Sequence, residues 1–194
     1  MRWCAVPDED LYIGPTVLAP GAPERPDRLA RRLLIPLAVS LAFVVLIFYV
    51  LFNGTRVDGD SMEPTFMNGD RLLMTRGYTA LHRGDVVVFS ATDDFGKRAE
   101  LMKRVVAIGG DTIQVTQDTA WVNGKQESGY PLIKSAQDPA DAGPYTVPKN
   151  TVFVLGDNRP ISFDSRMLGS IPMKTVKGRV VFRWGPIWRS GPIK

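Results

Sequence analysis

Two spacings of apolar residues divide the chain. Residues 33–52 form an unbroken apolar run, "LLIPLAVSLAFVVLIFYVLF", whereas the apolar residues after position 52 come in short runs bounded by glycine and aspartate. A helix rises about 1.5 Å per residue, so a run of this length spans about 30 Å, the thickness of the hydrocarbon core of a bilayer. A cleaved secretory signal has a shorter apolar core and a small-x-small site, which the sequence after Val50 lacks. The run therefore predicts one uncleaved transmembrane helix over residues 33–52.

The short apolar runs, which are rich in Val, Ile and Phe, predict β-strands. We expect these strands at residues 71–74, 85–90, 101–108, 112–116, 120–122, 151–155 and 176–184. The Asn123-Gly124 pair predicts a tight hairpin, because a type I′ turn requires positive φ at both of its central residues. No long amphipathic pattern separates the runs, so residues 53–194 are predicted to form a mainly β, antiparallel domain. Residues 129–150 contain four prolines and are predicted to be a surface loop or a small insertion.

The first 32 residues contain five prolines and little apolar periodicity, which is typical of a flexible tail. Four arginines precede the apolar run, at positions 25, 28, 31 and 32, and only Arg56 and Arg71 lie in a similar length after it. Since basic residues accumulate on the cytoplasmic side of membrane proteins, the N-terminus is predicted to be cytoplasmic. Residues 53–194 are then extracytoplasmic, on a protein of the plasma or inner membrane.

Charge and cysteine content narrow the classes of partner. From Asn53 onward there are 19 Lys and Arg against 15 Asp and Glu, so the whole net charge of +4 lies in the β-rich part. These charges are interspersed, which favours contact with a lipid surface over nucleic-acid binding. Cys4 is the only cysteine, so neither an internal disulfide nor a multi-cysteine metal site is expected. The scattered carboxylates and the single histidine show no metal-ligand spacing, and we expect no cofactor.

The first candidate for chemistry is Ser61 in the motif "GDSMEPTF", residues 59–66, which follows the apolar run. Its position in a Gly- and Asp-rich turn suggests an exposed nucleophile close to the bilayer. A Ser-His-Asp triad would depend on His82, which stands before the strand-like "RGDVVVF" and is interpreted as an exposed turn residue.

The other side chain that can activate a serine is a neutral lysine, and Lys103 in "ELMKRVVAIGGD" is the candidate. Burial among apolar neighbours disfavours the charged ammonium and lowers a lysine pKa. Taken alone, such a lysine is more often at a sheet edge or extended toward water. A polar cluster downstream, "LGDNRPISFDSRMLG", supplies Ser162 to orient the lysine and an Asp164-Arg166 ion pair to order its surroundings. A solvated turn explains that cluster equally well.

Together these segments resemble the type I signal peptidases, which are membrane-anchored Ser-Lys endopeptidases that remove signal peptides from exported preproteins. The resemblance covers most of residues 33–184 through five short motifs in order: the anchor, "GDSMEPTF", "RGDVVVF", "MKRVVAIGGD" and "GDNRPISFDSRMLG". It implies a mainly β catalytic domain, preproteins and the lipid bilayer as partners, and cleavage after a small-x-small sequence.

Residue by residue, the resemblance makes Ser61 the nucleophile, with its backbone N–H in the oxyanion hole, and Lys103 the general base. Ser162 would orient Lys103, while Asp164 and Arg166 would support the site. The predicted substrate pocket is lined by Val57, Met62, Leu101 and Met102. The tryptophans in "FRWGPIW", Trp184 and Trp188, are candidates for the lipid interface or for the core.

The sequence departs from the family's pattern at Gly59, where some members have a serine whose hydroxyl joins the oxyanion hole. The segment between the lysine and "GDN" motifs is also short, which indicates a minimal form. Two alternatives remain at this stage. One is a pilin-maturing peptidase of conjugative transfer with the same chemistry, and the other is a non-catalytic, membrane-anchored β adaptor.

Overall fold

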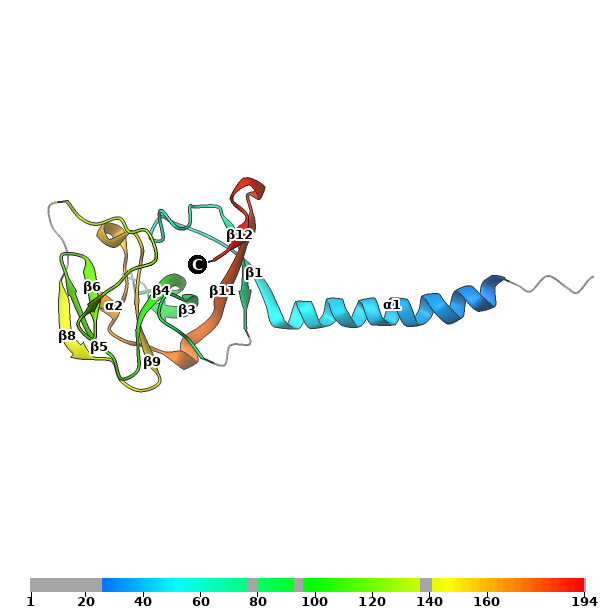
Figure 1. The fold of residues 1–194 in the computed structure, drawn as a ribbon, viewed down its shortest axis with the longest axis horizontal. Coiled ribbons are helices and arrows are strands. Elements are labelled where there is room, and N and C mark those ends of the chain that lie inside the picture. The colour runs from blue at the N-terminus through cyan, green and yellow to red at the C-terminus, as the bar shows by residue number, and fades with distance from the viewer. Residues whose placement is uncertain (1–25, 77–79, 93–95, 137–140, 194) are drawn as a thin grey trace, which may run out of the picture. The chain divides into compact units, whose positions relative to one another are not determined.

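The computed structural model describes residues 26–76, 80–92, 96–136 and 141–193, and the chain divides into two compact units, Met1–Val44 and Val45–Lys194 (Figure 1). Positions 1–25 of the predicted tail lie outside the described residues. Helix α1, Pro26–Leu51, begins before the predicted boundary at residue 33. Within it, Ala30–Leu51 has a mean hydropathy of 2.8 and no buried residue, so it is long and apolar enough to cross a membrane.

A large antiparallel sheet forms most of the second unit, in the strand order β1-β2-β11-β3-β4-β9-β10, with β12 paired to β11. Its strands are β1 Phe52–Arg56, β2 Arg71–Thr75, β3 Val86–Thr92, β4 Arg98–Ile108, β9 Thr151–Leu155, β10 Ile171–Pro172, β11 Val176–Gly185 and β12 Gly191–Pro192. Five strands of this sheet were predicted from the apolar runs, and the mainly β, antiparallel class is confirmed. The prediction missed β1, which follows α1 directly and takes Phe52 from the predicted helix.

A second antiparallel sheet has the order β7-β6-β5-β8. It consists of β5 Thr112–Thr116, β6 Thr119–Val122, β7 Lys125–Gln126 and β8 Ala142–Thr146. Asn123 (φ 51°) and Gly124 (φ 77°) connect β6 to β7 with positive φ, which confirms the predicted hairpin. Strand β8, inside the segment 129–150 that was predicted to be a surface loop or a small insertion, pairs with β5 and so belongs to this sheet.

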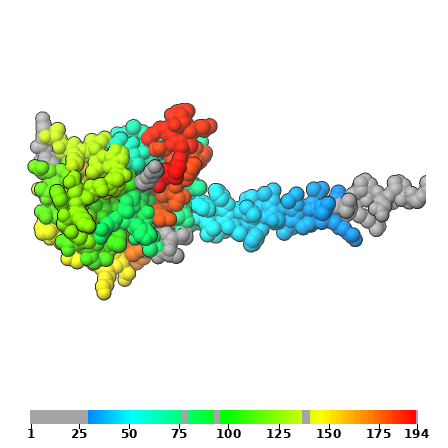
Figure 2. All heavy atoms as spheres, in the orientation of Figure 1, coloured from blue at the N-terminus to red at the C-terminus, as the bar shows by residue number. Residues whose placement is uncertain are grey.

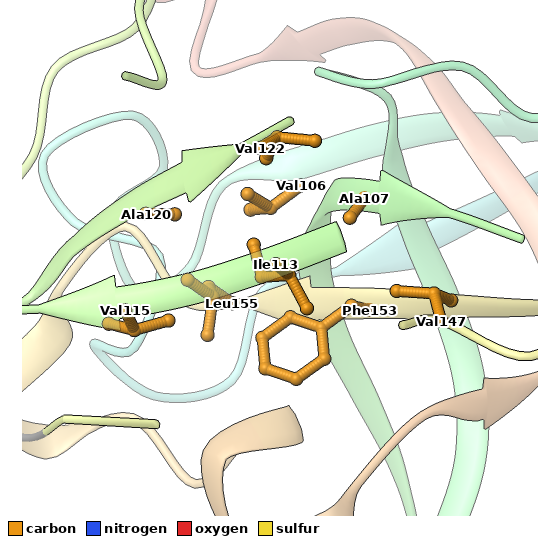
Figure 3. Packing of buried hydrophobic residues seen from close by; sticks show 9 residues of the cluster. All are labelled: Val106, Ala107, Ile113, Val115, Ala120, Val122, Val147, Phe153 and Leu155. Atoms are coloured by element: carbon orange, nitrogen blue, oxygen red, sulfur yellow. The ribbon is translucent and has the colours of Figure 1, made fainter. Parts of the chain in front are cut away.

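The two sheets pack on a shared hydrophobic core, whose side chains Figure 3 shows. β5 alternates exposed and buried residues, so Ile113 and Val115 point into this core, and from the large sheet β9 supplies Phe153 and Leu155. Burying each such side chain stabilises the fold by about 1.5–3 kcal/mol. The remaining members of the cluster are Val106, Ala107, Ala120, Val122 and Val147.

Short helices connect the strands of the second unit. They are the 3₁₀ turns η1 Arg159–Ile161, η2 Met173–Thr175 and η3 Ile187–Arg189, and the single-turn helix α2 Ser165–Leu168. β5, β6 and β8 lie at one end of the unit and β1 and β11 at the other (Figure 1). Strand β4 pairs with β3 along its first half and with β9 along its second, so it crosses the middle of the large sheet.

Candidate active site

Ser61 lies in the turn that follows β1. Gly59 has φ +95°, a conformation that favours glycine, and the turn is closed by hydrogen bonds from Glu63 N–H to the Asp60 carbonyl (3.1 Å) and from Phe66 N–H to the Met62 carbonyl (2.9 Å). Met62 and Phe66 are buried in one hydrophobic cluster. These two anchors hold the turn on the sheet while Ser61 stays partly exposed.

Lys103 approaches Ser61 from β4. Its Nζ donates a hydrogen bond to Ser61 Oγ at 2.6 Å, although 42 residues separate the two in sequence. The side chain is only 3% exposed, and this burial lowers the pKa of Lys103 to about 8. The carboxylates of Asp164 and Asp157 act in the opposite direction and raise this pKa, whereas Arg166 lowers it further.

A cleft of about 260 Å³ opens beside these two residues. Its lining comes mainly from two segments, Thr55–Gly59 and Glu100–Lys103. All four predicted pocket residues line it: Val57, Met62, Leu101 and Met102. Val57 and Met62 are buried, and Leu101 and Met102 are partly buried, so the cleft has apolar surface beside the serine.

The predicted hydrogen bond from Ser162 to Lys103 is absent. The Ser162 hydroxyl is buried and has no hydrogen-bond partner among the described residues. It lies instead against Gly156, where an added Cβ would overlap Ser162 Oγ and would lie 2.6 Å from the Ser61 carbonyl oxygen. The local sequence could not show this, because one serine rotamer decides whether the hydroxyl faces the lysine or the glycine.

The ion pair expected between Asp164 and Arg166 is present, with 2.9 Å between Asp164 Oδ1 and Arg166 Nε. Asp164 also accepts a hydrogen bond from Gly156 N–H at 3.0 Å, and it caps α2 by accepting from Arg166 N–H. Arg166 contacts a second carboxylate, Asp118 in the β5–β6 turn, at 3.0 Å. The pair therefore stabilises the conformation of the segment after β9 and connects this segment to the small sheet.

A second buried ion pair was not predicted. Arg104, the neighbour of Lys103, donates two hydrogen bonds to Asp157 at 2.8 and 2.6 Å, and Thr65 Oγ1 donates a third to the same carboxylate at 2.5 Å. The ring of Tyr130 lies 4.1 Å from the Arg104 guanidinium. The sequence placed Asp157 in the polar cluster, but it gave no signal that Arg104 is its partner.

The small sheet contributes further buried charges. Arg159 forms two hydrogen bonds of 2.7 Å to Glu127, which follows β7, and Tyr130 donates to the same carboxylate at 2.8 Å. Burial, followed by the charge of Glu127, raises the pKa of the Tyr130 hydroxyl, which keeps that hydroxyl a donor. Neither Glu127 nor Tyr130 stood out in the sequence, because each lies in a polar loop without a motif.

His82 is 73% exposed at a turn before β3, as the sequence indicated. In the ranges that the structure describes, no group of three or more His, Cys, Asp or Glu side chains is arranged to hold a metal ion.

A serine hydroxyl hydrogen-bonded to a buried lysine amine beside a cleft is the arrangement found in hydrolases of the Ser-Lys class. The family model described as signal peptidase, peptidase S26, matches residues 30–188, which is most of the chain. The chain therefore belongs to this family of membrane-anchored serine peptidases, and its activity is the removal of signal peptides from preproteins.

Curated relatives agree with this assignment. A signal peptidase I of Bacillus licheniformis is 36% identical over 77% of this chain and 84% of its own length. A signal peptidase IB of Staphylococcus aureus strain Mu50 is 34% identical over 77% of this chain and 87% of its own length. A solved signal peptidase I from Enterococcus faecalis V583 is 29% identical, with a TM-score of 0.44 over 53% of this chain and 98% of that chain. The family match and the curated relatives show that the adaptor alternative is wrong.

Proposed function

We propose that Ser61 is the nucleophile and Lys103 the general base of this signal peptidase. The observation that carries the proposal is the 2.6 Å hydrogen bond between Lys103 Nζ and Ser61 Oγ. A lysine with a pKa of about 8 is partly neutral at physiological pH, and a neutral amine in hydrogen-bond contact can accept the serine proton.

The chemistry follows from this pair. Lys103 Nζ takes the proton of Ser61 Oγ while Oγ bonds to the scissile carbonyl carbon, and the carbonyl electrons move onto its oxygen. The N–H of Ser61 stabilises this oxyanion. Protonated Lys103 then donates its proton to the leaving nitrogen as the C–N bond breaks. Finally Lys103 deprotonates a water that attacks the acyl carbon, and Ser61 Oγ leaves with the proton.

Substitution of either member tests the pair. Ser61→Ala and Lys103→Ala are each expected to lower the cleavage of a purified preprotein by at least about 10³-fold, because members of such a unit act together. Circular dichroism and thermal unfolding of the full chain in detergent serve as the control for folding. Substantial cleavage by a folded Ser61→Ala variant would refute the assignment of the nucleophile.

We infer that the preprotein binds as an extended strand with small side chains one and three residues before the cut. Among the described strands, β1 pairs only with β2, and residues 98–103 of β4 pair only with β3, so each of these strands that line the cleft has a free edge. A peptide backbone can add to such edges while its alternate side chains enter pockets. The four residues Val57, Met62, Leu101 and Met102 support shallow apolar pockets for them.

A preprotein series tests this specificity. Replacing the alanine just before the cut by phenylalanine is expected to lower kcat/KM by at least about 10²-fold, while the same change two residues after the cut has little effect. Equal cleavage of both would contradict the proposed pockets. Incubating the enzyme with a preprotein and a propilin together separates the pilin-maturing alternative, which requires cleavage of the propilin alone.

We also propose that the N-terminus is cytoplasmic and the β-rich unit extracytoplasmic, from the arginines that precede the anchor. Cys4 offers a native probe for the tail. In intact cells, a membrane-impermeant maleimide is expected to leave Cys4 unlabelled and to label a Cys4→Ser variant that carries Asn68→Cys on the exposed turn before β2. The opposite labelling pattern would reverse the orientation.

The C-terminal segment, red in Figure 2, lies on the surface of the β-rich unit and is the proposed contact with lipid. Ile187 is 87% and Trp188 85% exposed, and Trp184 is 47% exposed. Exposed aromatic side chains of this kind favour the interface of a bilayer. In vesicles with brominated lipids, variants of the full chain that keep only Trp184 or Trp188 should be quenched, whereas a variant that keeps only Trp121, on the small sheet, should not. Equal quenching of all three would contradict this contact.

A further inference from the structure

Asn158 holds the backbone on both sides of Ser61. Its backbone N–H donates to the Ser61 carbonyl at 3.1 Å, and its side-chain Nδ2 donates to the Asp60 carbonyl at 3.2 Å. Two consecutive carbonyl groups of the nucleophile turn are thus fixed by one residue from a segment that lies almost a hundred positions later in the sequence.

The contact with Asp60 determines the direction of the Ser61 N–H. The peptide bond between Asp60 and Ser61 is trans, since the cis bonds of the described residues all precede prolines. In a trans peptide the C=O and the N–H point in opposite directions. With the Asp60 carbonyl held toward Asn158, the Ser61 N–H points away from Asn158. No hydrogen bond of this N–H to the protein is found in the described part of the chain, which leaves it available to a ligand.

Asn158 is itself rigidly held. It is 8% exposed, and its neighbour Asp157 is fixed by the side chains of Arg104 and Thr65. The backbone on either side of Asn158 pairs with Ile133, which donates to the Asp157 carbonyl at 2.9 Å and accepts from Arg159 N–H at 2.9 Å. A side chain supported in this way keeps its donors in place while substrate binds and leaves.

The Ser61 N–H needs to be held in place because Gly59 has no side chain that could donate a second hydrogen bond to the oxyanion. No hydroxyl is present at this position, so the oxyanion relies on the Ser61 N–H more than it would with a side-chain donor beside it. A hydrogen bond accepted by the carbonyl of a peptide also polarises the N–H of the same peptide and strengthens it as a donor.

We propose that Asn158 is a positioning residue of the oxyanion hole, which aims the Ser61 N–H at the developing negative charge by holding the carbonyls of Asp60 and Ser61. This inference rests on the proposed role of Ser61. Its consequence is selective: Asn158 stabilises the transition state and contributes little to the binding of uncleaved substrate.

The experiment compares Asn158→Ala with the isosteric Asn158→Asp, which removes the Nδ2 donor and keeps the backbone N–H. In each, kcat for a preprotein is expected to fall about 10- to 100-fold while KM changes less than about twofold, because removal of a whole oxyanion donor costs about 10² to 10³ in kcat. In Asn158→Ala the pH at which kcat/KM reaches half its maximum should stay at the wild-type value, since no charge near Lys103 changes. Asn158→Asp adds a carboxylate that raises the pKa of Lys103, so its kcat is compared with the wild type on the high-pH plateau, where the amine is neutral.

A peptide aldehyde provides the second readout, because the Ser61 hydroxyl adds across its C=O and leaves an oxygen in the oxyanion hole. Its affinity is expected to weaken by the same factor as kcat/KM, whereas the affinity for the matching peptide alcohol stays constant. Asn123→Ala is the matched control: it removes an asparagine that hydrogen-bonds Asp111 and Thr112 at the base of the small sheet, and it should lower Tm but not kcat.

Full kcat in a folded Asn158→Ala or Asn158→Asp variant would overturn the proposal. A loss that appears equally in KM, or a shift of the pH midpoint in Asn158→Ala, would also overturn it. If Asn158→Ala does not fold, Asn158→Asp decides. An error in the assignment of Ser61 as nucleophile can be told apart from an error in the role of Asn158. The first would appear as cleavage by Ser61→Ala, whatever the result of the Asn158 variants.

Discussion

Arg104 and Asp157 form a two-pronged ion pair inside the protein, with their side chains 1% and 0% exposed. Each is adjacent to a residue of the site, since Arg104 follows Lys103 on β4 and Asp157 lies between Gly156 and Asn158. The pair therefore fixes the distance between the strand that carries the proposed base and the segment that holds the nucleophile turn.

Removal of one partner of this pair is expected to be severely destabilising. Asp157→Ala leaves the Arg104 guanidinium buried without its counter-charge, so the free energy of unfolding should fall by about 3–5 kcal/mol in urea titrations of the full chain in detergent. Lys177→Ala breaks the exposed pair with Glu100 and should cost less than about 1 kcal/mol. A loss at Asp157 no larger than at Lys177 would contradict the importance of the buried pair.

The rate of cleavage should rise with pH through the pKa of Lys103. Because burial lowers this pKa to about 8, the amine is mostly protonated at pH 6 and mostly neutral at pH 9, and only the neutral form accepts the serine proton. We expect kcat/KM to increase about tenfold per pH unit below pH 7 and to level off above pH 9. A profile that is flat between pH 5 and 8 would count against lysine as the base.

The same pKa predicts a dependence of stability on pH that requires no substrate. The folded state releases the Lys103 proton near pH 8 and the unfolded state near 10.5, so between these values the unfolded chain binds more protons and the free energy of unfolding rises with pH. Relative to a Lys103→Met variant, which lacks this group, the wild-type chain should gain up to about 3 kcal/mol across this range. If the free energy of unfolding changed with pH in the same way for both proteins, the pKa of Lys103 would not be lowered in the folded state.

Gly156 should not tolerate a side chain. The Cβ of Gly156→Ala would overlap Ser162 Oγ and press on the Ser61 carbonyl, so kcat should fall by at least about 10²-fold through displacement of the nucleophile turn. Gly191→Ala, where a Cβ meets nothing within 4 Å, is the matched control and should keep wild-type cleavage. Combining Gly156→Ala with Ser162→Ala removes only the contact with Ser162 Oγ and leaves the Ser162 Cβ at 2.5 Å and the Ser61 carbonyl oxygen at 2.6 Å, so activity should stay low. Full recovery of activity would contradict displacement of the nucleophile turn by the added Cβ.

Loss of the Ser162 hydroxyl should not destabilise the protein. Its Oγ is buried without a partner, so Ser162→Ala removes a desolvated polar group and should raise or maintain the free energy of unfolding, by up to about 1 kcal/mol. Thermal unfolding of the full chain measures this effect. A loss above about 1 kcal/mol would show that the hydroxyl makes a hydrogen bond in solution.

The sequence predicted those features that depend on local pattern. A short apolar run located β5, whose residues alternate between buried and exposed in the structure, and the pairing of Ser61 with Lys103 was inferred from a cation on an otherwise apolar strand. Strand β8 was missed because Gly143 and Pro144 interrupt the pattern that a strand normally shows.

Choices between distant polar partners could not be predicted. The aspartates nearest to Arg104 in the sequence are Asp94 and Asp111, but its partner Asp157 lies 53 residues away. Asp118 is one of several surface-type aspartates in the sequence, and only the packing of the small sheet brings it to Arg166. Such contacts are set by the assembly of the two sheets, which no local periodicity encodes.

The small sheet supplies the counter-charges for two arginines of the "GDNRPISFDSR" segment, through Glu127 for Arg159 and Asp118 for Arg166. A shortened chain without residues 112–146 would leave Arg159 without Glu127 and Arg166 with Asp164 as its remaining ion-pair partner of those described above. Deleting the small sheet to obtain a shorter enzyme would therefore remove ion-pair partners from the segment that holds the nucleophile turn, so the large sheet is not expected to be stable without it.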